Sequence, residues 1–422
     1  MKDKIINKKM MENIVFMIGS LSYGFTSLIY LIIITRVMGI EAAGQYSFAF
    51  AIAATFYVVG VYFGSAFQIT DTSKKYTDSD YIYNRITTIS FMIIMTLLFS
   101  LINGYNNQKL ILIFLLVIYR GFDAIIDSFH AIIQKKDRIY KNGILTFVRT
   151  ILLIITFLTT TILFKKLLYS VISIVILDFI FVFFVELLVV KKMITRRKYD
   201  NGKNIMLLVE GFSVFVFSFL AMYILNIPKY AIDHNLNNTL QGIFGIIFMP
   251  SSFMSMISMY MVQPFYNDIS NCIKNKKVIA LKKMIKKLSW IIFFSGVVMT
   301  LIAYLIGVPV LEFLYGIDLS TYRINLLIIM SGTIFYSLYC LLSSTLIALR
   351  KNNQQVVTLL FISAISIIIC NVMTKKYGIS GASYSYFIIM LIQSIIYVVL
   401  YLYYVNKLNK KEDCHKTYGW FR

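Results

Sequence analysis

The sequence predicts an all-α membrane protein with about twelve transmembrane helices arranged as two parallel six-helix halves. Three observations lead to this prediction. Of 422 residues, 59% are hydrophobic and only 14% are charged, whereas soluble domains average about 45–50% apolar and about 25% charged residues. The chain contains only 4 prolines. Its apolar residues also gather in long runs, so the composition excludes a soluble enzyme or a nucleic-acid-binding module as a description of the whole chain.

The apolar runs predict the individual helices. A helix needs about 20 apolar residues to cross roughly 30 Å of hydrocarbon. The predicted spans are residues 14–35, 43–67, 86–102, 110–133, 144–164, 167–190, 205–226, 239–264, 289–311, 324–349, 356–373 and 379–405. The runs at 86–102 and 356–373 are short for a bilayer, so we expect those helices to stand nearly upright or to include flanking residues.

The distribution of basic residues predicts the orientation in the membrane. With both termini in the cytoplasm, the inward segments hold 31 of the 41 Lys and Arg residues, the outward connections hold 8, and 2 lie inside spans. Cytoplasmic segments carry the excess of bases in membrane proteins. We therefore expect a multi-pass membrane protein with both termini in the cytoplasm.

One inward connection has a pattern of its own. At a helical period, Lys282, Lys283, Lys286 and Lys287 share one face, and apolar residues of 281–288 share the other. This pattern suits a helix on an anionic inner leaflet. Ordinary cytoplasmic charge with some helical order explains it equally well.

The span at 110–133 holds the densest set of ionisable side chains. Arg120, Asp123, Asp127 and His130 fall within an arc of about 80° on a helix with 3.6 residues per turn. Ionisable residues inside a membrane usually face protein or water and mark function. The four side chains therefore line a cavity or a helix interface, and a purely structural seam of ion pairs remains the alternative.

Estimated depth suggests partners for these groups. Asp127 and Arg149 lie at similar depth on a helical hairpin, and Arg120 and Asp178 both lie near the midplane. An unpaired Arg120 would instead suit a phosphate, because guanidinium binds paired phosphate oxygens and keeps its proton. For Glu186 and Glu210 we expect side chains that reach toward cytoplasmic bases.

Two more bases are candidates for an anionic ligand. Arg36 and Lys229 lie at the outer ends of the first and seventh spans. Together with Arg120 and Arg149 they form the predicted pyrophosphate-binding set. The acids inside the spans outnumber the two arginines, so Asp123, Asp127, Asp178 and His130 are candidates for ion coupling or for counter-ions. No motif predicts a metal site, a cofactor or a catalytic residue.

Weak internal similarity suggests that the chain is a duplication. In both halves a base closes the first span and a glycine, Gly44 or Gly242, opens the second. Each half would begin in the cytoplasm, which gives a parallel repeat. The predicted lobes are residues 1–200 and 201–422.

Three short segments carry a resemblance to a known family. Residues 36–47, RVMGIEAAGQYS, resemble the first-hairpin signature of the Wzx-type polysaccharide flippases of the multidrug/oligosaccharidyl-lipid/polysaccharide exporter superfamily. Residues 313–316, FLYG, and 377–382, YGISGA, are similar to the same family. The lipid II flippase branch is expected to carry arginines in its first span, and residues 14–35 contain none. The resemblance therefore indicates the surface-polysaccharide branch.

This resemblance implies two six-helix lobes around a central cavity and a transported substrate. The substrate would be an undecaprenyl-pyrophosphate-linked oligosaccharide, moved from the inner to the outer leaflet for capsule or O-antigen biosynthesis. Partners would be this substrate, membrane lipids and the polysaccharide polymerase machinery, with no nucleic acid. An ion-coupled multidrug or cation exporter of the same superfamily is the alternative. A membrane polymerase or glycosyltransferase is disfavoured, because the outward connections are too short for an active site.

Overall fold

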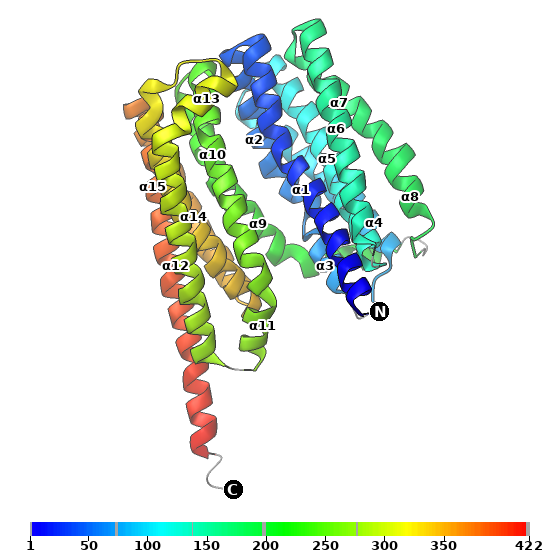
Figure 1. Ribbon diagram of the computed structural model, residues 1–422, viewed down its shortest axis with the longest axis vertical. Helices are drawn as coiled ribbons and strands as arrows, with labels where there is room; N and C mark the ends of the chain where they lie inside the picture. The colour runs from blue at the N-terminus through cyan, green and yellow to red at the C-terminus, as the bar shows by residue number, and fades with distance from the viewer. Residues whose placement is uncertain (1, 72–74, 137, 196–199, 276, 419–422) are drawn as a thin grey trace. The chain divides into compact units, whose positions relative to one another are not determined.

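The computed structural model describes residues 2–71, 75–136, 138–195, 200–275 and 277–418. The described residues form helices and turns, with no β-strand among them (Figure 1). The elements are α1 (Lys2–Met38), α2 (Ile40–Val61), α3 (Gly64–Thr70), α4 (Asp78–Ile102), α5 (Asn107–Lys135), α6 (Ile139–Phe164), α7 (Leu167–Phe181), η1 (Val182–Glu186), α8 (Leu187–Lys191), α9 (Asn201–Asn235), α10 (Asn238–Val262), η2 (Gln263–Phe265), α11 (Tyr266–Lys274), α12 (Val278–Ile302), η3 (Ala303–Gly307), α13 (Val308–Tyr315), η4 (Ser320–Tyr322), α14 (Arg323–Ala348) and α15 (Asn352–Tyr418).

The helices confirm a multi-pass membrane protein. In the described part of the chain, 10 helical segments are long and apolar enough to cross a membrane. One of them, within α15, contains two helices that meet at Gly378, where φ is 61° and ψ is −138°. The segment α5 is not among the 10 because its charged stripe breaks the apolar run, although its 29 residues are long enough to cross a bilayer. With α5 added and α15 divided, the structure accounts for the twelve predicted helices.

Contacts divide the chain into two compact units. Unit 1 is Met1–Asn226 and unit 2 is Ile227–Arg422. Most of α9 therefore packs with the helices that precede it. The division at residues 200 and 201 that the sequence suggests lies just before this helix, and it remains a prediction.

Two helix ends differ from those expected. The second span was expected to reach residue 67, but α2 ends at Val61, and the backbone turns at Tyr62 and Gly64, both with positive φ. In contrast, α4 starts eight residues before the predicted span, at Asp78. Its start is fixed by Thr77, whose backbone N–H and hydroxyl both donate to Asp80 Oδ2 at 2.8 Å. This is a capping box, which satisfies donors in the first turn of a helix.

The lysine-rich segment at 281–288 is not a separate surface helix. It is the first part of α12, which runs without a break into the following span. Leu281, Ile285 and Leu288 are buried, whereas Lys283, Lys286 and Lys287 are exposed. The amphipathic pattern is thus real, but its apolar face packs against protein.

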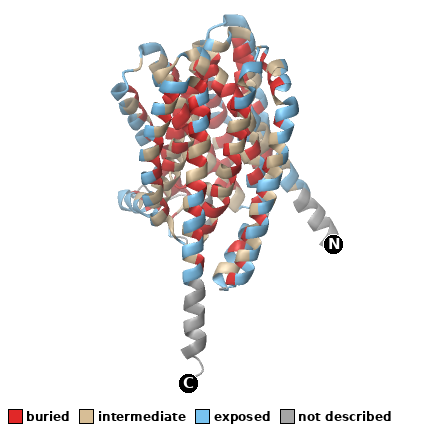
Figure 2. Ribbon diagram, turned by 90° about the vertical axis from the view of Figure 1, so that its left-hand side faces the viewer, coloured by how far each residue is buried: buried red, intermediate tan, exposed pale blue. Residues whose placement is uncertain are grey.

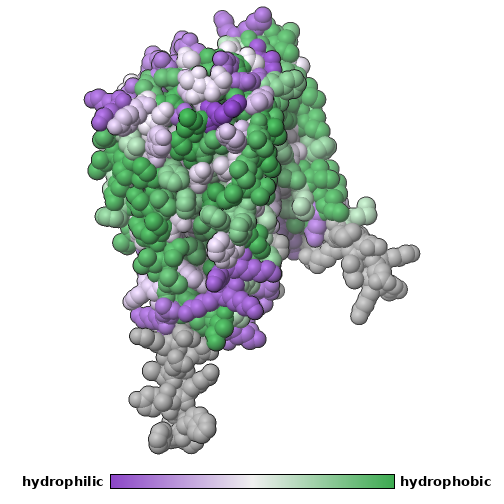
Figure 3. Space-filling view, turned by 60° about the vertical axis from the view of Figure 1, so that its left-hand side comes forward, coloured by the Kyte–Doolittle hydropathy of each residue, from purple (hydrophilic) through white to green (hydrophobic). Residues whose placement is uncertain are grey.

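The remaining surface fits a bilayer. Buried residues lie inside the helix bundle and exposed ones on its outer side (Figure 2). On the face drawn in Figure 3, hydrophobic side chains form a broad band between hydrophilic patches at its two ends. Large apolar side chains such as Phe313, 79% exposed, and Leu305, 70% exposed, belong to this outer surface. Exposed apolar side chains are unfavourable in water but not in contact with lipid tails, which are themselves apolar.

Candidate charged cavity in unit 1

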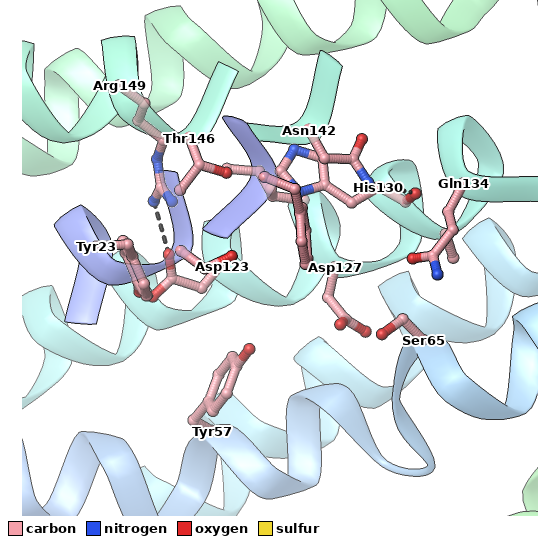
Figure 4. Close-up of a pocket in the computed structure, with 14 residues that line it drawn as sticks. Tyr23, Tyr57, Ser65, Asp123, Asp127, His130, Gln134, Asn142, Thr146 and Arg149 are labelled. Carbon is pink, nitrogen blue, oxygen red and sulfur yellow. Dashed lines mark hydrogen bonds and ion pairs between the residues drawn. The ribbon is translucent and has the colours of Figure 1, made fainter. Parts of the chain in front are cut away.

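Unit 1 contains a partly open cavity of about 260 Å³, lined by residues of α1, α2, α5 and α6 and by Ser65 of α3. Figure 4 shows the polar side chains that surround it. The lining residues are Phe16, Ser20, Tyr23, Tyr57, Ser65, Asp123, Ile126, Asp127, His130, Ala131, Gln134, Asn142, Thr146 and Arg149. A cavity with so many polar groups can hold water or a polar ligand.

The ionisable stripe of α5 supplies one wall. Asp123, Asp127 and His130 line this cavity, and Arg120 lines a smaller cavity of about 140 Å³ next to it. All four side chains thus lie at a cavity, as expected for a cavity or a helix interface, and their ion pairs also fit the alternative of a structural seam. The cause is the helical period, which places positions three and four residues apart on one face.

Arg149 of α6 forms the centre of a network of ion pairs. Its Nε donates to Asp178 Oδ1 at 2.6 Å, and its Nη2 donates to Asp178 Oδ2 at 2.6 Å and to Asp123 Oδ1 at 2.7 Å. The pair with Asp178 is bidentate, the strongest geometry for guanidinium and carboxylate. Both side chains are buried, so the two charges depend on each other.

Arg120 and Tyr23 complete the network on the other side of Asp123. Arg120 Nη1 donates to Asp123 Oδ2 and to the Tyr23 hydroxyl, both at 2.9 Å. The Tyr23 hydroxyl in turn donates to Asp123 Oδ2 at 2.5 Å. The Asp123 carboxylate thus accepts from three side chains, which belong to α1, α5 and α6. Arg149 extends the network to Asp178 of α7.

These contacts correct both predicted pairs. Asp127 does not pair with Arg149, and Arg120 does not pair with Asp178; the two arginines instead share Asp123. Equal depth did not predict the pairs, because an arginine side chain is long enough to bond to a residue one helical turn away in depth. Arg149 bonds to Asp123, which lies one turn from Asp127 on α5, and to Asp178 of α7.

Asp127 has a partner that sequence reasoning missed. Arg85 of α4 donates from Nη2 to Asp127 Oδ2 at 2.9 Å, and its Nη1 donates to the carbonyl oxygens of Gly60 and Val61 at the end of α2. Arg85 was assigned to a cytoplasmic connection, because the apolar run begins after it. The signal that could have found it is Thr77-Asp78-Ser79-Asp80, whose capping pattern starts the helix two turns earlier.

The two glutamates differ in their surroundings. Glu186 is fully buried and lies 3.1 Å from His130 Nε2 through Oε1, so its expected reach toward cytoplasmic bases is wrong. It closes η1, a π-helical turn, and such turns often occur at functional sites. Glu210 does reach a base: Lys75 Nζ donates to its Oε1 at 2.5 Å, and this hydrogen bond raises the pKa of the Lys75 ammonium. That Lys75 faces the cytoplasm stays a prediction.

The two remaining candidate bases are not among the residues that line either cavity. Arg36 is exposed in the last turn of α1. Lys229 belongs to unit 2, where its Nζ lies 5.0 Å from the centroid of the Phe248 ring. The larger cavity is lined by two acids, Asp123 and Asp127, and by one arginine, Arg149, whereas Arg120 lines the smaller one. The larger cavity is therefore not basic.

Comparisons with known proteins show which solved structures have a similar architecture. No protein-family model matches the chain. In structure, the chain is similar to a multidrug resistance MATE family transporter of the MOP superfamily in an inward-facing conformation, with a TM-score of 0.66 and 10% identity, covering 92% of this chain and 96% of that one. It is also similar to the lipid II flippase MurJ in an inward closed conformation, with a TM-score of 0.63 and 18% identity, covering 93% and 87% of the two chains. These likenesses show the fold of that transporter superfamily.

A curated relative has a similar sequence along nearly its whole length. The capsular polysaccharide biosynthesis protein CapF of Staphylococcus aureus is 24% identical over 411 residues, which cover 94% of this chain and 100% of CapF. Together with the fold, this match confirms the resemblance to the Wzx-type polysaccharide flippases that the sequence predicted.

Proposed function

We propose that this protein moves an undecaprenyl-pyrophosphate-linked oligosaccharide repeat unit from the inner to the outer leaflet for surface polysaccharide biosynthesis, by alternating access. The observation that carries the proposal is the match with a capsular polysaccharide biosynthesis protein over nearly the full length of both chains. A fold similar to that of a lipid II flippase supports it. The protein acts as a transporter and not as an enzyme. It works in the bacterial plasma membrane with both termini in the cytoplasm.

The network around Asp123 supports a role for unit 1 in coupling. Arg120 and Arg149 are both held by this carboxylate. A proton on Asp123 would cancel the charge that binds Arg120 Nη1 and Arg149 Nη2, and one N–H of each would then be available to a pyrophosphate oxygen, while Arg149 keeps its bidentate pair with Asp178. The Asp123 carboxylate and the substrate phosphate would thus compete for the same two arginines, and protonation of Asp123 would favour the phosphate. Asp127, Asp178 and His130 act as counter-ions or as further proton sites in this scheme.

The outer bases complete the proposed route for the anion. Arg36 of unit 1 and Lys229 of unit 2 each offer a further positive charge to the pyrophosphate. The polysaccharide polymerase machinery receives the unit at the outer leaflet. Replacing Asp123 by Asn tests the coupling: it keeps the shape but removes the charge, so flipping should become independent of a proton gradient while binding of a pyrophosphate lipid is retained.

The acidic balance of the cavity favours a second candidate, an ion-coupled exporter of drugs or other cations. Two acids, Asp123 and Asp127, against one arginine, Arg149, suit a cationic substrate better than an anionic one. The structural likeness to a multidrug resistance transporter supports the same candidate. Drug susceptibility of a strain without this gene separates the two candidates. Hypersensitivity with normal surface polysaccharide would favour the exporter.

A further inference from the structure

The smaller cavity of unit 1 has an aromatic and polar lining. Its volume is about 140 Å³, and it is lined by Tyr23, Gly24, Thr26, Ser27, Tyr30, Phe50, Tyr119 and Arg120. Along α1, the larger cavity involves residues 16–23 and the smaller one residues 23–30. The two therefore follow each other along this helix, and Tyr23 belongs to both.

Buried polar atoms without partners surround this smaller cavity. Tyr30 is 1% exposed, and its hydroxyl has no hydrogen-bond partner among the residues that the structure describes. The same holds for Arg120 Nε. The hydroxyl of Tyr46, whose ring lies 6.4 Å from that of Tyr30, also has none in the described part of the chain. A buried polar group without a hydrogen-bond partner destabilises a protein by about 1–3 kcal/mol. A ligand that forms hydrogen bonds with these groups would therefore bind favourably in this cavity.

The lining has the chemistry of a site for a hydroxylated ring. Four of its residues are aromatic, two carry small hydroxyls, and one is a guanidinium. The apolar faces of sugar rings pack on aromatic side chains, and their hydroxyls bond to polar groups at the edge. Arg120 is held rigidly for such a contact, because its guanidinium lies 4.5 Å from the centroid of the Phe50 ring and is tied to Asp123 through Nη1. Its Nε remains as a donor.

The volume allows one six-membered ring to enter. A cavity of about 150 Å³ in another protein admits benzene, and this one is nearly as large and partly open. A pyranose is bulkier than benzene, so some of its hydroxyl groups would extend through the open part of the cavity. We propose that the smaller cavity of unit 1 binds one pyranose ring of the lipid-linked oligosaccharide, with Tyr30 Oη and Arg120 Nε bonding to its oxygens. This inference rests on the proposed function. It assigns the aromatic lining to sugar recognition and leaves the phosphate to Arg149 and its neighbours.

The test is binding of simple sugars to the purified full-length protein. The probes are methyl glucopyranoside, methyl N-acetylglucosaminide and methyl glucuronide, followed by saturation-transfer NMR. Two variants alter the site: Ser27→Leu fills the cavity, and Tyr30→Phe removes one hydroxyl. Ser22→Leu is the matched control, because Ser22 lies on the same helix and lines neither cavity. Thermal unfolding of each variant identifies any that do not fold.

The expected result is binding of at least one probe to the wild type and to Ser22→Leu, with no binding to Ser27→Leu. Tyr30→Phe should bind about 3- to 10-fold more weakly, as for one lost hydrogen bond. If no probe binds, or if Ser27→Leu binds as well as the wild type, the cavity holds water only and the inference is overturned. This outcome is independent of the proposed function, which is tested in cells: a strain without the gene can accumulate lipid-linked oligosaccharide whether or not the probes bind.

Discussion

Arg149 shows what the sequence can and cannot predict about single residues. That a buried arginine in a span needs acidic partners follows from the cost of an isolated charge in hydrocarbon. That α5 would carry its acids on one face follows from helical geometry. Which of Asp123, Asp127 and Asp178 pairs with Arg149 depends on helix packing and on the length of the arginine side chain. The local sequence does not determine how the helices pack. Both pairs estimated from depth were therefore wrong.

The energetic importance of Arg149 can be tested by stability. We expect Arg149→Met to lower the free energy of unfolding by about 3–5 kcal/mol, because it leaves Asp178 buried without its partner and leaves Asp123 with only one of its two arginines. Adding Asp178→Leu should recover part of this loss, since it removes the orphaned charge. The measurement is thermal or denaturant unfolding of the purified protein. Equal stability of Arg149→Met and the wild type would contradict the network.

A second residue-scale prediction concerns Arg85. Arg85→Met removes the hydrogen bonds to Asp127 and to the carbonyl oxygens of Gly60 and Val61. We expect a loss of about 2–4 kcal/mol, because these acceptors lie in the protein interior. Lys75→Met is the control: its pair with Glu210 is exposed, and an exposed pair contributes about 0–1 kcal/mol. A smaller effect for Arg85→Met than for Lys75→Met would contradict the contacts described for α4.

At the scale of helices, the sequence predicted nearly every span, because a run of apolar residues determines where a helix can lie in a bilayer. Helix ends were less predictable. Gly64 and Gly378 adopt backbone angles that end or divide helices, although both occur within or beside apolar runs. The early start of α4 depends on a capping box that hydropathy does not detect. Packing between helices also depends on contacts that a hydropathy profile does not describe.

The crossing of α1 and α6 gives an element-scale prediction. A Cβ atom at Gly19 would lie 2.2 Å from the carbonyl oxygen of Gly143, so the two backbones are in direct contact there. Close approach through small residues is typical of membrane helices. We expect Gly19→Ala to destabilise the protein by at least about 1–3 kcal/mol, because the helices must move apart. Gly121→Ala is the control, since its Cβ would find its nearest atom at 3.4 Å; equal stability of both variants would refute the crossing.

At the scale of the whole molecule, composition and charge distribution were sufficient for the class of protein. An apolar chain with short connections leaves few alternatives to a bundle of membrane helices. The family resemblance rested on three short segments, and the match with CapF over 94% of the chain now supports it. The substrate could not be derived in the same way, because the charged groups that line the larger cavity do not indicate an anion by themselves.

The proposed orientation predicts the outcome of reporter fusions. Alkaline phosphatase, which is active only outside the cytoplasm, should be inactive when fused after Arg138 and active when fused after Lys165. A fluorescent protein fused after Arg422 should fluoresce in the cytoplasm. The opposite pattern would invert the topology, and the 31-to-8 division of bases would then need another explanation.

Transport of a pyrophosphate lipid should respond to the membrane potential. Each elementary charge is worth about 2.3 kcal/mol per 100 mV, so two negative charges moving outward from a negative interior gain about 4.6 kcal/mol. In proteoliposomes we expect a potential or a proton gradient to accelerate flipping. Flipping that ignores both would exclude a net movement of charge.

The most direct test of the central claim is the lipid-linked oligosaccharide content of a strain that lacks this gene, measured together with its surface polysaccharide. If the protein is the flippase, the complete lipid-linked unit accumulates at the inner leaflet and polymer disappears from the surface. Normal surface polymer without an accumulated intermediate would contradict the account, and the acids around Asp123 would then become the binding site of a cation exporter.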